Sequence, residues 1–329
     1  MNFALSEDVL AVRDGLRAAL RANCPTDLVR EASSSQGDER VRGLWKLLAD
    51  MGVLGLLVPE SFGGLGLDEL FLAVALEELG YVGAPGPLGE VIAIAAPVLA
   101  QSPGQEDLLT RVLAGDALVA FSLRDDHVAY AQLCDAFLFV REGQVELSTR
   151  DHVEVTPLAT VDRSRRAGSV QVRVASTTLP FSRLRGALER ATLAAAAELV
   201  GLSARMLDMT KEYVQARQQF GVPIGSFQAV KHALANSLIK IEFARPAIWR
   251  AAASLSSGDP QAAWHVSMAK ALASDAAREV AKTSIQCHGA MGYTVEYDLQ
   301  LFAKRAWARC ADWGDSEQHI ARIANWLEV

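Results

Sequence analysis

The sequence predicts a mainly α-helical chain with a small β domain in its middle, and three observations support this fold class. Long Ala- and Leu-rich segments with helical periodicity fill the C-terminal part of the chain. The N-terminal part also has helical periodicity, interrupted by Gly and Pro. Between them lie short apolar runs typical of strands. We therefore expect an N-terminal helical domain over residues 1–117, a small β domain over 118–184 and a C-terminal four-helix bundle over 185–329.

The N-terminal domain is expected to contain only helices, over about residues 6–115. Gly and Pro divide it at residues 63–64, 83–87 and 102–104, where we expect turns. The middle domain is expected to hold four strands, at 136–140, 144–147, 153–155 and 169–174. The last three of these runs alternate apolar and polar residues, as half-buried strands do.

The C-terminal part is expected to form a bundle of four long helices. Its Ala-, Leu-, Glu- and Lys-rich segments run over residues 187–217, 226–256, 260–289 and 297–327. Five of the chain's tryptophans lie in these segments or at their ends, where we expect core or interface positions.

Composition excludes several function classes. The chain has 329 residues, 50% of them hydrophobic, and a net charge of −7, which argues against a nucleic-acid surface. No run of 18 apolar residues is free of charges or turn signals, and the first 13 residues lack a signal-peptide pattern, so we expect no membrane span and a cytoplasmic protein. The four cysteines, Cys24, Cys134, Cys287 and Cys310, share no metal-ligand spacing, so we expect reduced thiols and no metal.

The segment 212–228 carries the most specific signal. A helix ends there with Arg217 and Gln219, followed by Phe220 and a Gly/Pro turn. Arginine offers a rigid fork of donors for a phosphate, glutamine offers a donor and an acceptor, and a phenylalanine offers a flat apolar face to a ring. A plain helix end with a basic residue and a Gly stop would explain Arg217 and Gly221, but not the rest of the segment.

A second Gly-rich segment, 286–293, follows a long Ala-rich helix and includes Gln286, Gly289 and Gly292. Glycines let a backbone approach a ligand closely, so this turn is a candidate seat for a nucleotide edge, although any helix hairpin can use glycine. A Cys287–His288 nucleophile pair is not expected, because adjacent residues at a helix end do not face each other.

These two motifs, with Gly63-Gly64 and Leu76-Glu77-Glu78-Leu79-Gly80 in the N-terminal part, resemble the acyl-CoA dehydrogenase family. The resemblance implies the same helix, sheet and bundle order. It also implies the following flavin contacts: Arg217 and Gln219 at the FAD pyrophosphate, Phe220 at its adenosine or ribityl side, Gln286, Gly289 and Gly292 along the adenosine, and Phe227 and Gln228 within the same signature.

Two of these residues also have structural interpretations. Phe227 is expected in the bundle core, and Gln228 is expected at a helix start for which Ser226 is a good N-cap.

The chain departs from the family in the middle domain. Family members that hold their own flavin carry a Thr-Glu-Pro turn, a Gly-Ser-Asp step and a Trp-Ile-Thr strand around the flavin ring. Residues 120–130 stand at the corresponding place without them, and about 65 residues separate the two helical parts. We expect this reduced β domain to hold flavin poorly on its own.

The family's catalytic carboxylate is also missing. Many relatives take it from a Tyr-Glu-Gly-Thr turn, whereas this chain reads Asp312-Trp313-Gly314-Asp315, with Trp313 at the Glu position. Asp312 and Asp315 are candidate displaced bases, but a shift on the order of 1 Å can cost about a hundredfold in rate.

The first helix of the bundle offers two further carboxylates, Glu189 and Glu198. Their spacing fits an exposed helix residue or a salt-bridge partner better than a base. We therefore predict no catalytic residue in this chain.

The resemblance implies a specific role. The chain is similar to the smaller non-catalytic (β-type) subunit of bacterial α2β2 acyl-CoA dehydrogenases, which act on bulky acyl-CoA thioesters such as those of steroid side chains. It would complete the FAD site of a catalytic partner subunit in a heterotetramer. Acyl-CoA and an electron-transfer flavoprotein or similar acceptor are the further partners implied.

Two alternatives remain open. One is a self-sufficient homomeric flavoenzyme of the same superfamily, either a dehydrogenase with a displaced acidic base or a flavin oxygenase. It requires FAD bound by the purified chain. The other is a non-redox acyl-binding or scaffold protein, for which Arg217 and Gln219 would be dispensable.

Overall fold

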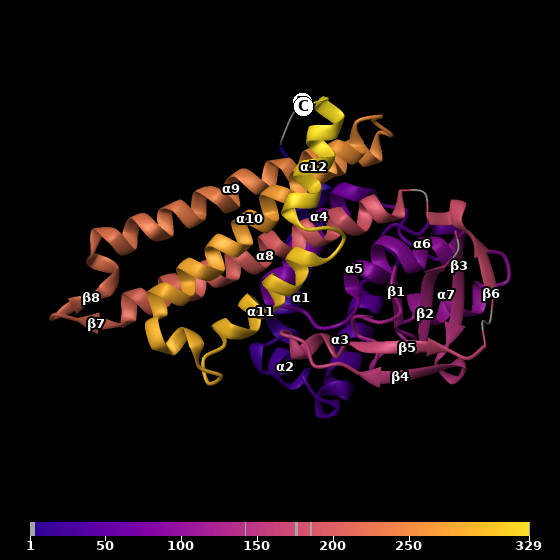
Figure 1. The fold of residues 1–329 in the computed structure, drawn as a ribbon, viewed down its shortest axis with the longest axis horizontal. Helices are drawn as coiled ribbons and strands as arrows, with labels where there is room; N and C mark the ends of the chain where they lie inside the picture. The colour runs from indigo at the N-terminus through magenta and orange to yellow at the C-terminus, as the bar shows by residue number, and fades with distance from the viewer. Residues whose placement is uncertain (1–3, 142, 175–176, 185, 329) are drawn as a thin grey trace. The chain divides into compact units, whose positions relative to one another are not determined.

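The chain folds into two compact units (Figure 1). The computed structural model describes residues 4–141, 143–174, 177–184 and 186–328. The bundle unit comprises Met1–Ala22, Ala73–Ala84 and Thr192–Val329, and the sheet unit comprises Asn23–Leu72 and Pro85–Ala191. The predicted domain boundaries at residues 117 and 184 stay a prediction.

Helices make up most of the bundle unit. They are α1 (Glu7–Asn23), α4 (Glu69–Val82), α8 (Ala187–Ala216), α9 (Gln228–Ser256), α10 (Ala262–His288), α11 (Leu299–Ala311) and α12 (Ser316–Leu327), of which α1, α4 and α8 each extend past a unit boundary. In Figure 1, α8, α9 and α10 run alongside one another. The first three predicted bundle segments are confirmed as α8, α9 and α10, but the fourth is wrong as a single helix, because a turn at 312–315 divides it.

Small residues let α4 and α8 approach closely. A Cβ at Gly201 would lie 2.0 Å from Glu77 O, and a Cβ at Gly80 would lie 2.3 Å from Glu198 O. No side chain fits at such distances, so glycine is required on both helices. This contact explains the glycine of the predicted 76–80 motif.

The described residues of the sheet unit form short helices and six strands. Its helices are α2 (Thr26–Glu31), α3 (Asp38–Asp50), α5 (Leu88–Glu90), α6 (Ala96–Ala100) and α7 (Glu106–Leu113), with a π-helical segment at Val91–Ala95. Its strands are β1 (Val119–Ser122), β2 (Ala136–Arg141), β3 (Gln144–Thr149), β4 (Val153–Pro157), β5 (Gly168–Val172) and β6 (Thr177–Pro180). The predicted mainly α fold with a small β domain is confirmed.

The strands form two small sheets. One has the order β1-β2-β3-β6, with β1 parallel to β2 and the other pairs antiparallel, and β4 pairs with β5 antiparallel in the second. The four predicted strands correspond to β2, β3, β4 and β5. Strand β2 is buried on both faces. Phe137 and Phe139 lie in the core on one face and Leu138 lies in the core on the other, so the sequence of β2 does not alternate between apolar and polar residues.

The residues described here include no helix that is both long and apolar enough to cross a membrane. They also include no group of three or more His, Cys, Asp or Glu side chains that could hold a metal ion. None of the four cysteines forms a disulfide.

Candidate functional site

The predicted cofactor motif folds into an exposed hairpin between α8 and α9. We call residues 217–228 the first arm. Two-residue strands β7 (Gln218–Gln219) and β8 (Val222–Pro223) pair antiparallel, and Phe220 and Gly221 join them with φ angles of 54° and 79°. Two consecutive residues with positive φ are the requirement of a type I′ hairpin turn, which explains the glycine.

The hairpin presents the predicted ligand-binding side chains to solvent. Arg217 and Gln219 are exposed, and Phe220 is 93% exposed. Within the described part of the chain, Arg217 makes no side-chain hydrogen bond or ion pair, and the Gln219 amide donates only to Gln218 O at 2.8 Å. A guanidinium in this state is available for a phosphate.

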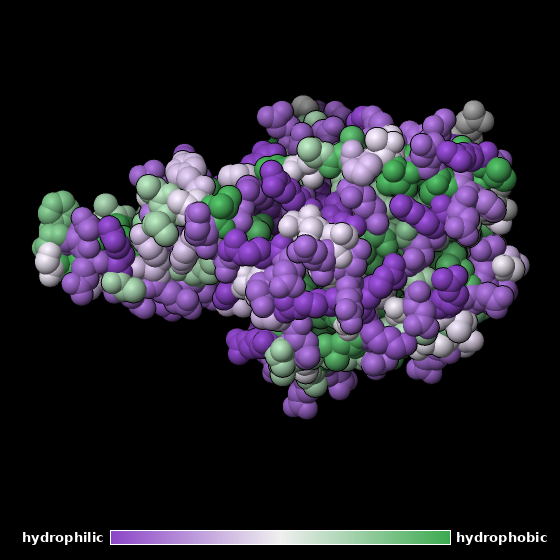
Figure 2. Space-filling view, turned by 90° about the horizontal axis from the view of Figure 1, so that it is seen from below, coloured by the Kyte–Doolittle hydropathy of each residue, from purple (hydrophilic) through white to green (hydrophobic). Residues whose placement is uncertain are grey.

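Aromatic side chains cover the end of the first arm. Phe227 is 39% exposed and meets Phe220 edge to face, with ring centroids 6.2 Å apart. Figure 2 shows apolar surface at the left end of the molecule, where Figure 1 places β7 and β8. The expectation that Phe227 lies in the bundle core is wrong. Phe227 precedes the first turn of α9, and its partly exposed side chain packs against Phe220 of the hairpin.

The start of α9 also differs from the prediction. Phe227 occupies the N-cap position of α9, and Gln228 is its exposed first residue. The Ser226 hydroxyl donates to Pro223 O at 2.7 Å, so Ser226 closes the preceding turn and does not cap the helix.

The second arm, residues 286–293, forms the end of α10 and a 3-10 turn at Gly289–Tyr293. Gln286 is exposed. Gly289 has φ 59° and ψ −136°, a conformation that only glycine adopts readily. A Cβ at Gly292 would lie 3.0 Å from Ile285 O. The turn itself therefore requires both glycines, and Gln286 and Tyr293 are the exposed residues of this arm whose side chains carry polar groups.

The two arms lie at the same end of the bundle. The Tyr213 hydroxyl on α8 donates to His288 O at 3.4 Å, and the two rings stack with centroids 4.2 Å apart. Tyr213 lies four residues before Arg217, and His288 lies two residues after Gln286. The structure therefore brings together the two predicted cofactor motifs, which are about 70 residues apart in the chain.

The turn at the expected position of the catalytic base is clamped by a buried lysine. Lys270 of α10 is fully buried, and its ammonium group donates to Ser274 Oγ at 3.2 Å, Cys310 O at 3.0 Å and Gly314 O at 2.8 Å. Three donors thus meet three acceptors. Burial lowers the pKa of Lys270 to about 8.

A buried histidine holds the other side of this turn. His319 Nε2 donates to Trp313 O at 3.0 Å, and the pKa of His319 is lowered to about 4 by burial and by the nearby Lys270 charge. Trp313 and Gly314 both have positive φ, 59° and 100°, and a Cβ at Gly314 would lie 2.9 Å from His319 Nε2. Hydrogen bonds and close packing therefore fix the backbone that carries Trp313.

The carboxylates near this turn are engaged in structural contacts. Arg309 Nε and Nη2 lie 2.7 and 2.6 Å from Glu198 Oε2, and Arg309 Nη1 lies 2.9 Å from Asp312 Oδ2. Glu198 is buried, as is Arg309, so the predicted ion pair is present and the alternative of an exposed Glu198 is wrong. Asp315 accepts from Gln318 N at 2.8 Å and caps α12.

The fourth candidate carboxylate, Glu189, is half-buried in the first turn of α8, where a negative charge suits the helix dipole. Three of the four substitute bases considered above are therefore occupied by structural hydrogen bonds. A carboxylate whose oxygens already accept these hydrogen bonds would have to give them up to reach a substrate proton.

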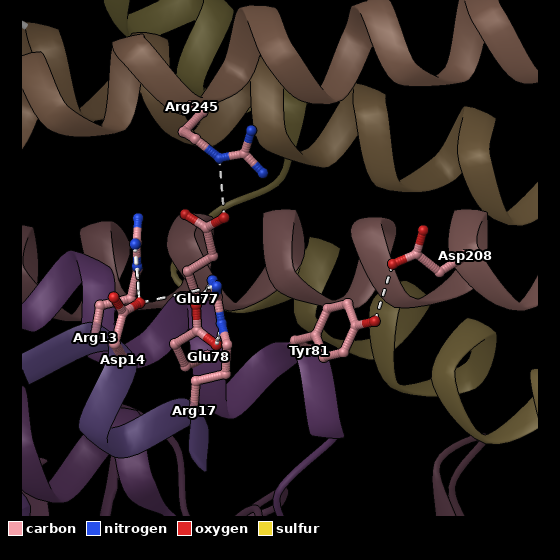
Figure 3. A network of polar contacts seen from close by, with 8 residues as sticks. All are labelled: Arg13, Asp14, Arg17, Glu77, Glu78, Tyr81, Asp208 and Arg245. Carbon is pink, nitrogen blue, oxygen red and sulfur yellow. Dashed lines mark hydrogen bonds and ion pairs between the residues drawn. The ribbon is translucent and has the colours of Figure 1, made fainter. Parts of the chain in front are cut away.

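The two glutamates of the 76–80 motif bind arginines on different helices (Figure 3). Glu77 accepts from Arg245 Nε of α9 at 2.9 Å, and Glu78 receives two bonds from Arg17 of α1, at 2.6 and 2.9 Å. Burial raises the pKa of Glu77, with the Arg245 charge acting in the opposite direction. This motif thus joins α4 to α1 and α9 and has a structural explanation.

Comparison with known proteins agrees with this arrangement. The acyl-CoA dehydrogenase N-terminal domain model matches residues 6–115, and the acyl-CoA dehydrogenase C-terminal domain model matches residues 181–328. The acyl-CoA dehydrogenase IpdE2 of Mycolicibacterium smegmatis is 32% identical over 322 residues, 97% of this chain and 98% of that protein. IpdE2 of Mycobacterium tuberculosis is 35% identical over 265 residues, 80% of each chain.

Two solved structures share the fold over nearly the whole chain. A chain of the ChsE4-ChsE5 complex from Mycobacterium tuberculosis has a TM-score of 0.89 and 26% identity, covering 100% of this chain and 99% of its own length. A chain of the Tcur3481-Tcur3483 steroid ACAD G363A variant has a TM-score of 0.88 and 25% identity, covering 98% of each. Both helical parts and the complete fold are thus matched, and the chain belongs to the acyl-CoA dehydrogenase family.

Proposed function

We propose that this chain is a subunit of an FAD-dependent acyl-CoA dehydrogenase that completes the FAD site of a catalytic partner subunit and supplies no base of its own. The contrast between its two sites supports this most strongly. The first arm presents Arg217 and Gln219 to solvent, whereas the turn that would carry the base presents Trp313 and is clamped by Lys270. The acyl-CoA dehydrogenase family uses FAD as its hydride acceptor.

The exposed residues fit the parts of a dinucleotide. The Arg217 guanidinium would bind the pyrophosphate through two donors, and the Gln219 side-chain oxygen would accept from a ribityl or ribose hydroxyl. Phe220, supported by the edge of Phe227, offers an apolar ring face beside them. Gln286 of the second arm would contact the adenosine. Gln228 lies exposed at the base of the first arm and is assigned to the same surface.

The proposal assigns α-proton removal to the partner. Desaturation of an acyl-CoA thioester needs a carboxylate that takes a proton from the α-carbon while a hydride leaves the β-carbon. In this chain Glu198 and Asp312 are bound to Arg309, and Asp315 caps a helix. These contacts count against the alternative of a displaced acidic base.

The relatives suggest the partner and substrate class. The ChsE4-ChsE5 complex and the Tcur3481-Tcur3483 steroid ACAD are each named for two chains. By extension, we place this chain in a heterotetramer with a catalytic acyl-CoA dehydrogenase, acting on a bulky, steroid-derived acyl-CoA. An electron-transfer flavoprotein or a similar acceptor would reoxidise the flavin.

Co-expression tests the assembly. The chain is produced alone and together with an acyl-CoA dehydrogenase from the same genome that carries the Tyr-Glu-Gly-Thr turn, and native mass and the flavin-to-protein absorbance ratio are measured. We expect a colourless chain alone and a yellow heterotetramer with about one flavin per two chains on co-expression. A yellow homo-oligomer with full flavin occupancy would refute the proposal in favour of a self-sufficient flavoenzyme.

Substitution of Arg217 tests the site. In the complex, Arg217→Ala should weaken FAD binding by about tenfold or more, because a charge-assisted pair with the pyrophosphate is lost, and should leave the native mass unchanged. Arg217→Lys, which keeps the charge and loses the fork, should give an intermediate value. Lys231→Ala removes an exposed cation from α9 and is the matched control. Equal FAD affinity in all four proteins would exclude Arg217 from the FAD site.

A further inference from the structure

Three aromatic rings meet where α8 leads into the first arm and α10 ends in the second, and one of them, His288, belongs to the second arm. Tyr213 of α8 stacks on His288, the last residue of α10, with centroids 4.2 Å apart and an interplanar angle of 26°. Tyr297, just before α11, lies 4.8 Å from His288 and 5.9 Å from Tyr213 between centroids. We call these three residues the aromatic stack. None of them belongs to the ligand-facing set assigned above.

His288 is held in one orientation. Its Nδ1 lies 2.7 Å from Ser284 O, and because a carbonyl oxygen only accepts, Nδ1 carries the proton. Its Nε2 is then a lone-pair acceptor, buried and without a partner among the described residues. Burial lowers the pKa of His288, so the ring stays neutral at neutral pH. The unsatisfied Nε2 atom contributes nothing to holding the His288 ring. The bond from Nδ1 to Ser284 O and the packing against Tyr213 and Tyr297 hold it instead.

The stack contacts the backbone of both arms. The Arg217 N–H donates to the backbone carbonyl of Tyr213 at 2.8 Å, so the first arm begins one helical turn after the residue that carries the Tyr213 ring. The Tyr213 hydroxyl reaches His288 O at 3.4 Å, and a Cβ at Gly292 of the second arm would lie 3.1 Å from His288 Cβ. The Tyr213 side chain therefore joins the last turn of α8, from which the first arm continues, to His288 in the second arm.

We propose that the aromatic stack is a positioning device that sets the spacing between the Arg217 side of the first arm and the Gln286 side of the second. The proposal rests on the proposed function, because both arms must contact one dinucleotide at the same time. Each arm is short and solvent-exposed, and neither is bonded to the other through its own ligand-facing side chains. A fixed spacing lets FAD bind without first ordering the arms, which preserves affinity.

Two truncations and two conservative substitutions test this in the complex with the catalytic partner. Tyr213→Ala and His288→Ala remove a ring from the stack. His288→Phe keeps a ring of similar size without the Nδ1 donor, and Tyr213→Phe loses only the long hydrogen bond. Trp326→Ala is the matched control, because Trp326 stacks on Trp264 with centroids 4.8 Å apart at the opposite end of α10.

The first measurement is the FAD dissociation constant, obtained by titrating the apo complex. We expect each alanine variant to raise it by about tenfold or more, and the two phenylalanine variants and Trp326→Ala to stay within about threefold of the original protein. An unchanged dissociation constant in both alanine variants, alongside weaker binding by Arg217→Ala, would overturn the positioning role.

The second measurement is amide hydrogen exchange of the flavin-free complex. If the stack links the arms, either alanine substitution should speed exchange in peptides covering both 217–228 and 286–293, and His288→Phe should not. Faster exchange only in the arm next to the substitution would overturn the inference. Hydrogen exchange does not need FAD and therefore tests the link between the arms separately from the proposed function. The proposed function would fail if Arg217→Ala left the flavin affinity unchanged, whatever the exchange rates show.

Discussion

Replacement of His319 by glutamine should make the protein more resistant to acid. The pKa of His319 is lowered from 6.5 to about 4, first by burial and then by the Lys270 ammonium nearby. The unfolded chain therefore binds a proton at a higher pH than the folded chain does, and stability is lost as pH falls from about 6.5 to about 4. A pKa difference of this size corresponds to about 3 kcal/mol. Glutamine does not titrate, and its amide can still donate toward Trp313 O.

Urea unfolding at pH 7, 6, 5 and 4 measures this contribution. All other titrating groups are common to the two proteins, so the difference between their unfolding free energies should grow by about 3 kcal/mol in favour of His319→Gln between pH 7 and pH 4. His232→Gln, which removes an exposed imidazole from α9, is the control. Parallel pH profiles for the original protein and His319→Gln would show that the buried imidazole is not the acid-sensitive group, and the reasoning would fail.

Two further substitutions probe the packing of the bundle unit. Arg309→Met should destabilise it by about 3 kcal/mol, because the buried Glu198 carboxylate loses its two shortest contacts and retains Arg305, whose Nη1 lies 3.7 Å from Glu198 Oε1. Adding Glu198→Gln should recover much of the loss in urea unfolding. A double variant no more stable than the single one would contradict this account. Gly201→Ala should lower stability by about 1–3 kcal/mol, because its Cβ would meet Glu77 O at 2.0 Å. Gly15→Ala, a helical position with nothing within 4 Å, should raise it by up to about 1 kcal/mol, and equal melting temperatures for both would disprove the close-contact argument.

The helices could be predicted from local pattern, and the exceptions have local causes. Helices α8, α9 and α10 begin and end within a few residues of their predicted bounds, because Ala- and Leu-rich periodicity is strong over such lengths. The division between α11 and α12 was missed although Gly314 marked it. Strand β1 was missed although its residues 119–121 are apolar and buried like those of β2, whose run was predicted as a strand.

The candidate site was predictable only where it depends on neighbours in sequence. The turn of the first arm was predicted from Gly221 and Pro223, whereas the positive φ of Phe220, which is rare for a bulky side chain, was not. The partners of the carboxylates could not be read in the same way, since Glu198 and Arg309 are 111 residues apart. Likewise, nothing in the order of residues indicates that His288 packs on Tyr213. Such contacts arise from helix packing, which a single sequence does not encode in its periodicity.

Polar side chains face solvent at the first arm but are buried and bonded to the backbone at the turn around Trp313. At the first arm, Arg217 and Gln219 project from a hairpin into solvent, so a ligand can reach them. At the turn around Trp313, Lys270 and His319 hold the backbone carbonyls. A catalytic base must exchange a proton with its substrate, and the indole of Trp313 cannot do so in place of a carboxylate. Under the proposed function, the first site would bind the cofactor and the second would serve stability, and the chain would contribute to catalysis through the residues that it presents to a partner.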